Sequence, residues 1–455
     1  MAFVVVIVLL VVFSVGYHFY SVYGGMWLPE IASEWGTIDF TIDITFWVTG
    51  FVFVAINLFM AYAVYKFRYK KDQRAHYEPE NKKLETWLTL ATAVGVFAML
   101  APGLYVWATF VEVPEDAHEF EAIGQQWQWN FRYPGDDGVM GTADAKFVSP
   151  DNPHGVNPDD PFGRDDRIVI GSEMHLPINK PVKALLRSKD VLHDFAVAEF
   201  RVKMDLVPGL VSYLWLTPNR TGTFDILCEE LCGIGHHIMR GRVVVEEEAD
   251  YQAWLNSLPT FAQTQTVAAG DPQAGQANYA VCGGCHGTQG EGNQALNAPK
   301  LVGLEPWYIK RQIRYYKEGI RGAHEDDIAG QQMAPMAAVL VNDTAVNNVA
   351  AYIATLPDNP AQETINGNVF KGKKYFDATC GVCHGPEGQG IWAVNAPPLA
   401  GMSDWYLATQ LNNYKKGIRG HHRQDEFGYQ MVSMVSALAD EQAINDVVAY
   451  INTLR

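Results

Sequence analysis

This chain of 455 residues lacks three features: cysteines outside closely spaced pairs, an excess of basic residues, and the sequence pattern of a cleaved signal peptide. All six cysteines fall in close pairs inside ligand-like motifs, which leaves none for a structural disulfide. The formal net charge of −17 excludes a nucleic-acid partner, because no basic face offsets the repulsion from phosphates. The first apolar run has neither a basic n-region nor a small-residue cleavage site, so we expect a retained helix and not a signal peptide.

Three apolar segments near the N-terminus, at about 3–20, 41–65 and 86–110, are long enough to span a bilayer. They define an extra N-terminal span, 1–22, and a transmembrane hairpin, 41–110. The loop 66–83 carries seven Lys and Arg residues, whereas the loop 21–40 carries none. By the positive-inside rule the loop 66–83 is cytoplasmic. Everything after residue 110 is then expected outside, which in a bacterium is the periplasm.

Short β-rich runs replace the apolar segments between residues 115 and 250. Turn residues separate them, and the pattern predicts a β-sandwich. This domain also carries the acidity, with 24 Asp and Glu against 13 Lys and Arg. The stretch 134–166, rich in Asp, Pro, Gly and Asn, is expected to be a solvated loop held by Asx turns; calcium binding or partner docking is less favoured, because no regular ligand spacing appears. The predicted strands are 167–171, 182–188, 211–216, 222–227 and 242–247.

The last part of the chain is an internal repeat with a register of 98 residues and no gap, preceded by a linker at 259–273. The copies, 271–357 and 363–455, are both expected to be helical with long loops. The spacer between them is short and polar, so we expect the two copies to touch.

Each copy contains the c-type haem attachment pattern C-x-x-C-H. Two thiols two residues apart reach the two vinyl groups of a haem, and the adjacent histidine lies beneath the iron. One such match could be a zinc or redox pair, but two in register, each followed by Met at the same distance, strongly favour haem. The attachment residues are Cys282, Cys285 and His286 in the first copy, and Cys380, Cys383 and His384 in the second.

The sixth iron ligand has two methionine candidates in each copy, Met333 or Met336 and Met431 or Met434. The copies resemble small bacterial dihaem cytochromes c, in which the first methionine of the M-x-x-M segment is the ligand. This resemblance implies Met333 and Met431. The rival axial ligands are His324 and His422, which recur in register.

Carbonyls of Pro299 and Pro397 suit the second nitrogens of the axial histidines. Arg321 and Arg419 are candidates to pair with haem propionates, with a solvated loop cation as the equal alternative.

A second cluster of soft ligands lies in one loop, where Cys228, Cys232, His236 and Met239 follow at intervals of four, four and three. A distant histidine, His193, begins a predicted strand. Structural zinc would need only two thiolates and two imidazoles. The additional thioether fits two coppers bridged by both sulfurs, whereas a mononuclear blue-copper site would leave one cysteine surplus.

The pattern C-x-E-x-C-G-x-x-H-x-x-M at 228–239 resembles subunit II of haem–copper cytochrome c oxidases. So do the segments DVLHDF at 190–195 and KMDLVPG at 203–209, and the aromatic run at 126–130. The resemblance covers 41–250 and implies a cupredoxin-like domain with a dinuclear CuA centre, and fused class I cytochrome c domains also occur in the family. The implied copper ligands are His193, Cys228, Glu230 through its main-chain carbonyl, Cys232, His236 and Met239.

The same resemblance assigns three further roles. The Glu230 side chain would reach a magnesium ion shared with the catalytic subunit. Trp127 matches an aromatic electron-entry residue, although the fused haems offer another route. Glu85 matches a glutamate at the mouth of a proton pathway; by itself it is a helix-start carboxylate favoured by the helix dipole.

We therefore expect a multidomain membrane protein that is the electron-input subunit of an oxygen-reducing, proton-pumping oxidase in the bacterial inner membrane. Its partners would be the bilayer, subunit I, other oxidase subunits, and a periplasmic donor such as a cytochrome c. Chain order predicts that electrons pass from the second cytochrome copy to the first and then to CuA. The alternatives are the CuA subunit of a nitric oxide reductase, or an anchored electron carrier without a catalytic partner.

Overall fold

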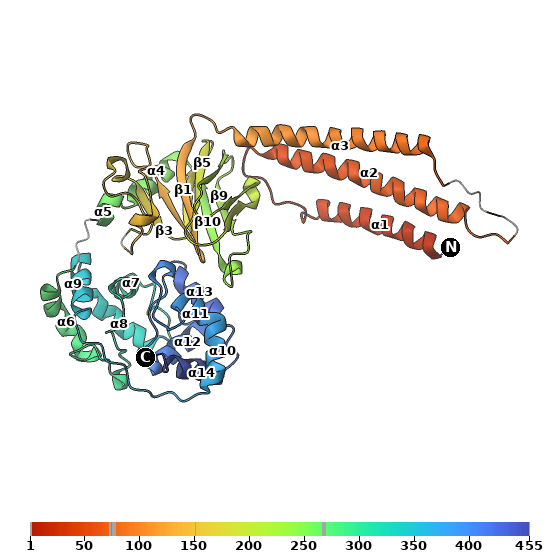
Figure 1. Cartoon of the computed structure of the whole chain (residues 1–455). Coiled ribbons are helices and arrows are strands. Elements are labelled where there is room, and N and C mark those ends of the chain that lie inside the picture. The colour runs from red at the N-terminus through yellow and green to blue at the C-terminus, as the bar shows by residue number, and fades with distance from the viewer. Residues whose placement is uncertain (1, 72–73, 75–78, 151, 266–269, 455) are drawn as a thin grey trace.

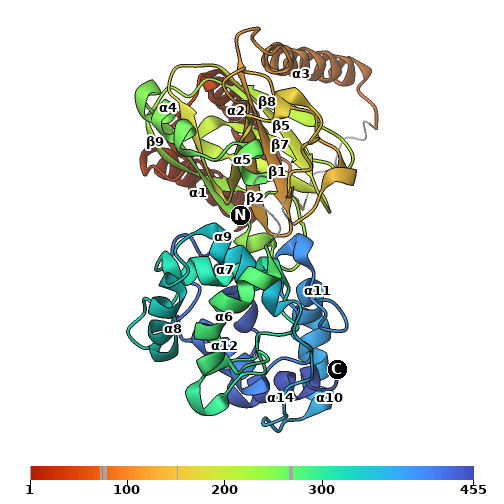
Figure 2. The same ribbon diagram turned by 90° about the vertical axis from the view of Figure 1, so that its left-hand side faces the viewer.

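The computed structural model describes residues 2–71, 74, 79–150, 152–265 and 270–454 (Figure 1). Three long helices lie side by side at one end, a two-sheet β domain follows, and a helical region lies against the far side of the β domain. The view turned by 90° shows the helical region as two adjoining groups of short helices (Figure 2). This arrangement confirms the predicted fold class.

The three N-terminal helices are α1 (Ala2–Tyr23), α2 (Gly36–Lys66) and α3 (Lys82–Val111). Each is long and apolar enough to cross a membrane, with mean hydropathies of 2.6, 2.0 and 1.8. Asn81 caps α3 by accepting a hydrogen bond from the Leu84 amide at 3.1 Å, which satisfies one of the free donors of the first turn. Pro102 lies inside α3, and the helix continues past it.

Two five-stranded sheets form the β domain, in the orders β3-β2-β1-β5-β8 and β4-β10-β9-β6-β7. All five predicted strands are present, as β3, β5, β8, β9 and β10. Strand β6 begins at His193, where the sequence predicted a strand start. Strands β1 and β2 were missed, because buried polar residues such as Gln125 and Asn130 hide their apolar alternation. The strands are β1 (His118–Gln125), β2 (Gln128–Tyr133), β3 (Arg167–Ile170), β4 (Glu173–Pro177), β5 (Val182–Ser188), β6 (His193–Val197), β7 (Val202–Leu206), β8 (Ser212–Leu216), β9 (Gly222–Leu227) and β10 (Arg240–Glu246).

Helix α4 (Glu248–Ser257) closes the β domain on its C-terminal side, so the expected boundary at residue 250 falls inside this helix. Tyr251 belongs to the core of the sandwich. Trp254 stacks on His175 of β4 with ring centroids 4.1 Å apart. The short helix α5 (Phe261–Gln265) follows, and residues 266–269 of the predicted linker lie outside the described residues.

The segment 134–166 connects β2 to β3 and contains the predicted Asx turns. Asp144 and Asp160, for example, accept hydrogen bonds from the amides two residues further on. The segment is not merely a solvated loop, however. Val156 is fully buried and packs with Ile168 of β3 and Phe261, so the segment is anchored to the elements beside it.

Tryptophans fasten the sandwich to the membrane hairpin. Trp35, just before α2, packs on Trp215 of β8 and donates to its carbonyl oxygen at 3.1 Å. Trp215 in turn donates to the Phe110 carbonyl in α3 at 2.9 Å. Arg201 and Asp39 add an ion pair at 2.6 Å. The sandwich is therefore held at the ends of α2 and α3, at a fixed height relative to the membrane-spanning helices.

The two repeats have corresponding helices and touch, as predicted. Lys300 of the first donates to the Gly401 carbonyl of the second at 2.8 Å, and Arg311 donates to the Asn395 carbonyl at 3.0 Å. The helices are α6 (Pro272–His286), α7 (Pro306–Lys317), α8 (Ile328–Ala338) and α9 (Asp343–Ile353) in the first repeat, and α10 (Val369–Tyr375), α11 (Gly381–His384), α12 (Asp404–Lys415), α13 (Glu426–Val435) and α14 (Glu441–Ile451) in the second.

Arg132 yields a stability prediction, because it is buried between Glu121 at 2.8 Å and Asp166 at 2.7 Å. Arg132→Met leaves the buried Asp166 without its cation and Glu121 with Arg187 alone, and it is expected to cost about 3–5 kcal/mol. Lys183→Met, which removes the half-exposed partner of Glu119, should cost at most about 1 kcal/mol. Thermal unfolding of the full chain in detergent, followed by β-sheet circular dichroism, compares the two; equal effects would contradict the prediction.

Candidate functional site

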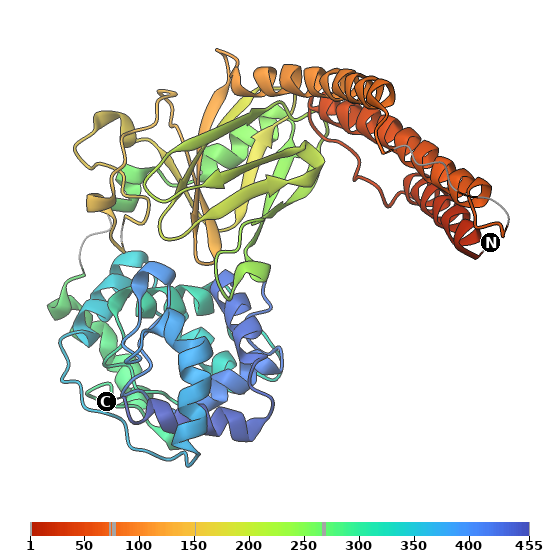
Figure 3. The same cartoon turned by 45° about the vertical axis from the view of Figure 1, so that its right-hand side comes forward.

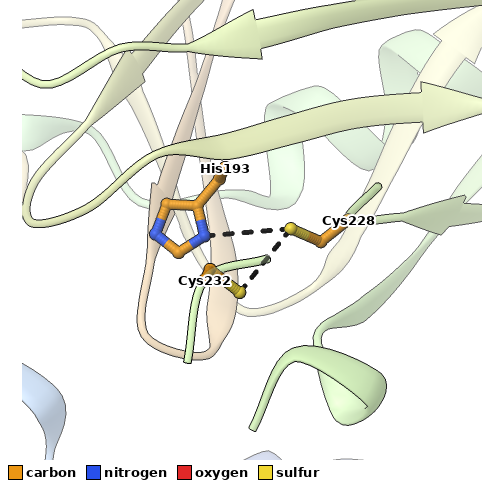
Figure 4. A group of neighbouring side chains, drawn as sticks. All are labelled: His193, Cys228 and Cys232. Atoms are coloured by element: carbon orange, nitrogen blue, oxygen red, sulfur yellow. Dashed lines mark hydrogen bonds between the residues drawn. The ribbon is translucent and has the colours of Figure 1, made fainter. Parts of the chain in front are cut away.

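The structure gathers the soft-ligand residues at one end of the sandwich. His193 begins β6, and Cys228 directly follows β9, its antiparallel neighbour. The Cys228 Sγ lies 3.9 Å from the His193 Nδ1 and 3.7 Å from the Cys232 Sγ (Figure 4). All three side chains are buried, and their donor atoms lie within 4.8 Å of one another, as a metal site requires.

The remaining predicted ligands complete this cluster. The His236 Nδ1 lies 3.6 Å from the Cys232 Sγ, and the Met239 Sδ lies 3.9 Å from the same sulfur. The Glu230 carbonyl oxygen lies 3.2 Å from the Cys228 Sγ. The donor set is thus two sulfurs at the centre, with an imidazole on each side, a thioether and one carbonyl. It exceeds the four ligands of a tetrahedral zinc and matches two metal ions sharing both sulfurs.

Asp190, which the sequence reasoning missed, orients His193. Its Oδ1 lies 2.8 Å from the His193 Nε2, which leaves Nδ1 facing Cys228. Burial of the ring lowers its pKa, but the hydrogen bonds of Asp190 and Cys228 outweigh burial and raise the pKa of His193 overall. A carboxylate three residues before the histidine, in the segment DVLHDF, was the available signal.

The two thiols are coupled by their contact. Their hydrogen bond lowers the pKa of Cys228 and raises the pKa of Cys232, so one proton is shared between the sulfurs. Metal ions that bind both sulfurs as thiolates displace this proton.

Trp127 lies against the same loop. Its indole Nε1 donates to the Cys232 carbonyl at 3.0 Å, and the neighbouring Gln126 side chain donates to the same oxygen at 2.8 Å. The ring packs so closely on Gly235 that a Cβ there would lie 2.3 Å from the ring. Trp127 and the copper-ligand loop, 228–239, therefore form one packed unit.

A continuous cavity runs through both repeats and is lined by all six haem-attachment residues. The Nδ1 atoms of His286 and His384 lie 2.7 Å from the carbonyl oxygens of Pro299 and Pro397, the carbonyls proposed from the sequence. Burial lowers the pKa of both rings, which keeps them neutral for iron binding. The residues present thus fit a covalently attached haem in each repeat.

The axial methionine candidates differ in exposure. Met333 and Met431 are half-buried, whereas Met336 is 42% exposed, and all three line the cavity. Met434 also lines the cavity and packs against the sandwich. The rival histidines, His324 and His422, are exposed and are not among the residues that line it.

Two buried arginines cross between the repeats at this cavity. Arg321 donates to Tyr406 and Gln410 of the second repeat at 2.6 and 3.1 Å, and Arg419 donates to Gln312 of the first at 3.0 Å. These partners are neutral, and within the described residues the Nε of each arginine has no hydrogen-bond acceptor. A buried cation without a counter-ion is costly, so the pair fits anionic groups such as propionates. This environment disfavours the solvated-cation alternative.

The second repeat contacts the sandwich beside the copper-ligand loop. Gln430, next to Met431, donates to the Trp127 carbonyl at 3.0 Å, and Gln125 donates to the Ala393 carbonyl at 3.1 Å. Cys383 and Met434 pack against the core of the sandwich. Figure 3 shows the second repeat, in blue, beneath the tip of the sandwich. The chain thus returns to the sandwich after the first repeat, so the repeat that is second in the sequence lies beside Trp127.

The two predicted glutamates, Glu85 and Glu230, differ in exposure. Glu85 is exposed in the first turn of α3, consistent with its favourable position relative to the helix dipole. The Glu230 side chain is half-buried at the copper-ligand loop.

Comparisons with known proteins agree with this arrangement. Residues 119–247 match the model of the cytochrome c oxidase subunit II periplasmic domain, and residues 272–357 and 369–455 each match the cytochrome c model. The alternative cytochrome c oxidase subunit 2 of Bradyrhizobium diazoefficiens is 58% identical over 262 residues, which cover 58% of this chain and 94% of the relative.

Two more distant relatives cover different parts of the chain. Cytochrome c oxidase subunit 2 of Cereibacter sphaeroides is 32% identical over 46% of this chain and 74% of its own. The crystal structure of cytochrome c4 from Pseudomonas stutzeri is 28% identical over 41% of this chain and all of its own, with a TM-score of 0.34. The chain therefore belongs to the cytochrome c oxidase subunit II family of haem–copper oxidases, with two cytochrome c domains after its periplasmic copper domain.

Proposed function

We propose that this subunit takes electrons from a periplasmic donor at its first cytochrome repeat and passes them through the second repeat to the copper-ligand loop. The contact of Gln430 with Trp127 carries this proposal, because it joins the second repeat to the loop that holds Cys228 and Cys232. We divide the chain accordingly into an extra span 1–22, a hairpin 41–110, a copper domain 115–250 extended by α4, and cytochrome domains 271–357 and 363–455.

The proposed cofactors are one dinuclear CuA centre and two covalent haems c, which when bound supply one-electron redox chemistry. His193, Cys228, Cys232, His236, Met239 and the Glu230 carbonyl would hold the coppers. Cys282, Cys285, His286 and Met333 would hold the first haem, and Cys380, Cys383, His384 and Met431 the second. With a methionine and a histidine as its iron ligands, each haem would have no open site, so each repeat would serve transfer rather than catalysis.

The chain's own residues organise the transfer. Trp127 excludes water from the copper-ligand loop and holds its Cys232 carbonyl, while Arg321 and Arg419 would neutralise haem propionates between the repeats. The Glu230 side chain would reach a magnesium ion shared with subunit I, and Glu85 would lie at a proton entry on the cytoplasmic side. The acceptor is oxygen in subunit I of an oxidase in the bacterial inner membrane, with the copper and cytochrome domains in the periplasm.

Oxygen uptake by the purified complex tests the function. A complex of this chain with a polytopic subunit is expected to consume oxygen when given a reduced donor, because the chain belongs to an oxidase family. Consumption of nitric oxide without oxygen uptake would indicate a nitric oxide reductase instead. Purification of the chain without a polytopic subunit would indicate a free-standing carrier.

Replacing one bridging sulfur tests the copper assignment. Cys232→Ser removes a soft ligand shared by both metals, so the purified chain should lose its copper pair and keep both haems. Metal analysis and electron paramagnetic resonance measure the copper, and optical spectra measure the haems. Stoichiometric zinc in the unaltered protein would reject the assignment.

Substitutions at equivalent positions of the two repeats test the order of transfer. Exchanging the axial methionine for histidine lowers a haem's potential. Met431→His should therefore slow electron passage from the first repeat to the copper centre, because the second haem becomes an uphill intermediate, whereas Met333→His should not slow passage from the second repeat to copper. Photoreduction followed by optical spectroscopy measures both rates. The opposite pattern would restore the order expected from chain order.

A further inference from the structure

The second repeat is seated on the sandwich through one defined face, formed by Cys383, Ala393, Gln430 and Met434. Gln430 donates to the Trp127 carbonyl, and the Ala393 carbonyl accepts from Gln125. Both sulfur-bearing side chains, Cys383 and Met434, pack on the core of the sandwich. Arg423, at the rim of this face, forms an ion pair with Glu173 of β4. This face is the one next to the proposed haem, since Cys383 and Met434 also line the cavity.

The repeat register of 98 residues places an equivalent face on the first repeat, formed by Cys285, Ala295, Gln332 and Met336. Its residue types are the same at all four positions. In the first repeat all four are exposed, whereas Cys383, Gln430 and Met434 are half-buried in the second. The same surface is therefore covered in one copy and open in the other.

The open face is also the more apolar of the two. Leu296 is 49% exposed and takes the place of Val394, which is half-buried in the second repeat. Val281 is 46% exposed and replaces Thr379; Val339 is 52% exposed, three residues after Met336, and replaces Ala437. Exposed apolar residues gathered around a cofactor edge are typical of interaction sites.

The charge at the rim is inverted between the copies. Arg423, which pairs with the acidic Glu173, corresponds to Glu325 in the first repeat, and Gln424 corresponds to Asp326. Glu325 and Asp326 are both exposed. A partner could bind the first repeat in the way that the sandwich binds the second. It would meet an acidic rim there, and it would need a basic residue at the place where the sandwich has Glu173.

We propose that the face of Cys285, Leu296, Gln332 and Met336, with Glu325 and Asp326 at its rim, is the docking surface for a small soluble electron-carrier protein. This carrier presents an apolar contact face bordered by lysine or arginine. The proposal rests on the proposed function, because it names the place where the donor binds. One electron passes from the reduced carrier to the oxidised first repeat, so the carrier leaves oxidised and the repeat is reduced.

The experiment uses the purified oxidase complex and a reduced mitochondrial cytochrome c, a small lysine-rich carrier, as the probe. Binding by surface plasmon resonance and the rate of haem reduction in a stopped-flow instrument are measured at low and high ionic strength. Glu325→Arg should weaken binding about 3- to 10-fold at low salt and approach the unaltered complex at high salt, because rim charges are screened.

Matched variants separate charge from shape. Glu387→Arg makes the same charge change at an exposed loop position of the second repeat and should alter binding less than about 2-fold. Leu296→Asn should weaken binding several-fold at both salt concentrations, because it removes apolar contact and not charge. Cytochrome c with acetylated lysines should bind the unaltered complex weakly. Unchanged haem spectra establish that each variant is folded.

The outcomes distinguish this proposal from the proposed function. If Glu325→Arg and Leu296→Asn behave like Glu387→Arg while the unaltered complex oxidises cytochrome c, the docking surface is rejected and the proposed function stands. If the unaltered complex takes up no oxygen with a small-molecule reductant either, the proposed function fails first. Tight binding of acetylated cytochrome c would reject the basic partner and retain only the apolar face.

Discussion

The two hydrogen bonds of Trp127 hold the parts of this molecule in a single working arrangement. Its indole donates to Cys232 in the copper-ligand loop, and its main-chain carbonyl accepts from Gln430 in the second repeat. The residue is almost wholly buried, so both bonds are shielded from competing water. Positions of the soft ligands, the docking of the second repeat and the proposed direction of transfer all depend on this one side chain and its backbone.

Around that joint, the fold separates tasks by distance from the membrane. The tryptophan contacts at Trp35 and Trp215 fix the sandwich on the membrane helices. The copper-ligand loop lies at the end of the sandwich that receives the cytochrome repeats (Figure 3). Arg321 and Arg419 then bind the repeats to each other across a shared cavity. Each boundary between parts combines a few specific polar contacts with apolar side chains, such as Trp35 and Met434, that pack on the core of the sandwich.

Short-range patterns in the sequence predicted most of the cofactor chemistry and the fold class. Cys228, Cys232 and Cys282 are recognisable because ligands in one loop keep a fixed spacing. His193 was a candidate ligand at a predicted strand start, and the family resemblance implied its role at copper. Asp190 and the strands β1 and β2 were missed, because buried polar residues there obscure the expected alternation. The contact of Gln430 with Trp127 joins residues 303 apart, and no local pattern encodes such a pairing. For that reason the order of the repeats required the three-dimensional arrangement.

The covalent connection between the sandwich and its cytochrome repeats changes what their interface has to achieve. A free carrier must bind tightly enough to be captured and weakly enough to leave, whereas a tethered one never departs. A tether of this kind raises the effective concentration of one partner at the other to the millimolar range. A few hydrogen bonds around Gln430 and Gln125 therefore suffice to keep the second repeat bound to the sandwich. Each turnover then needs one association step, whereas a series of separate carriers would need two.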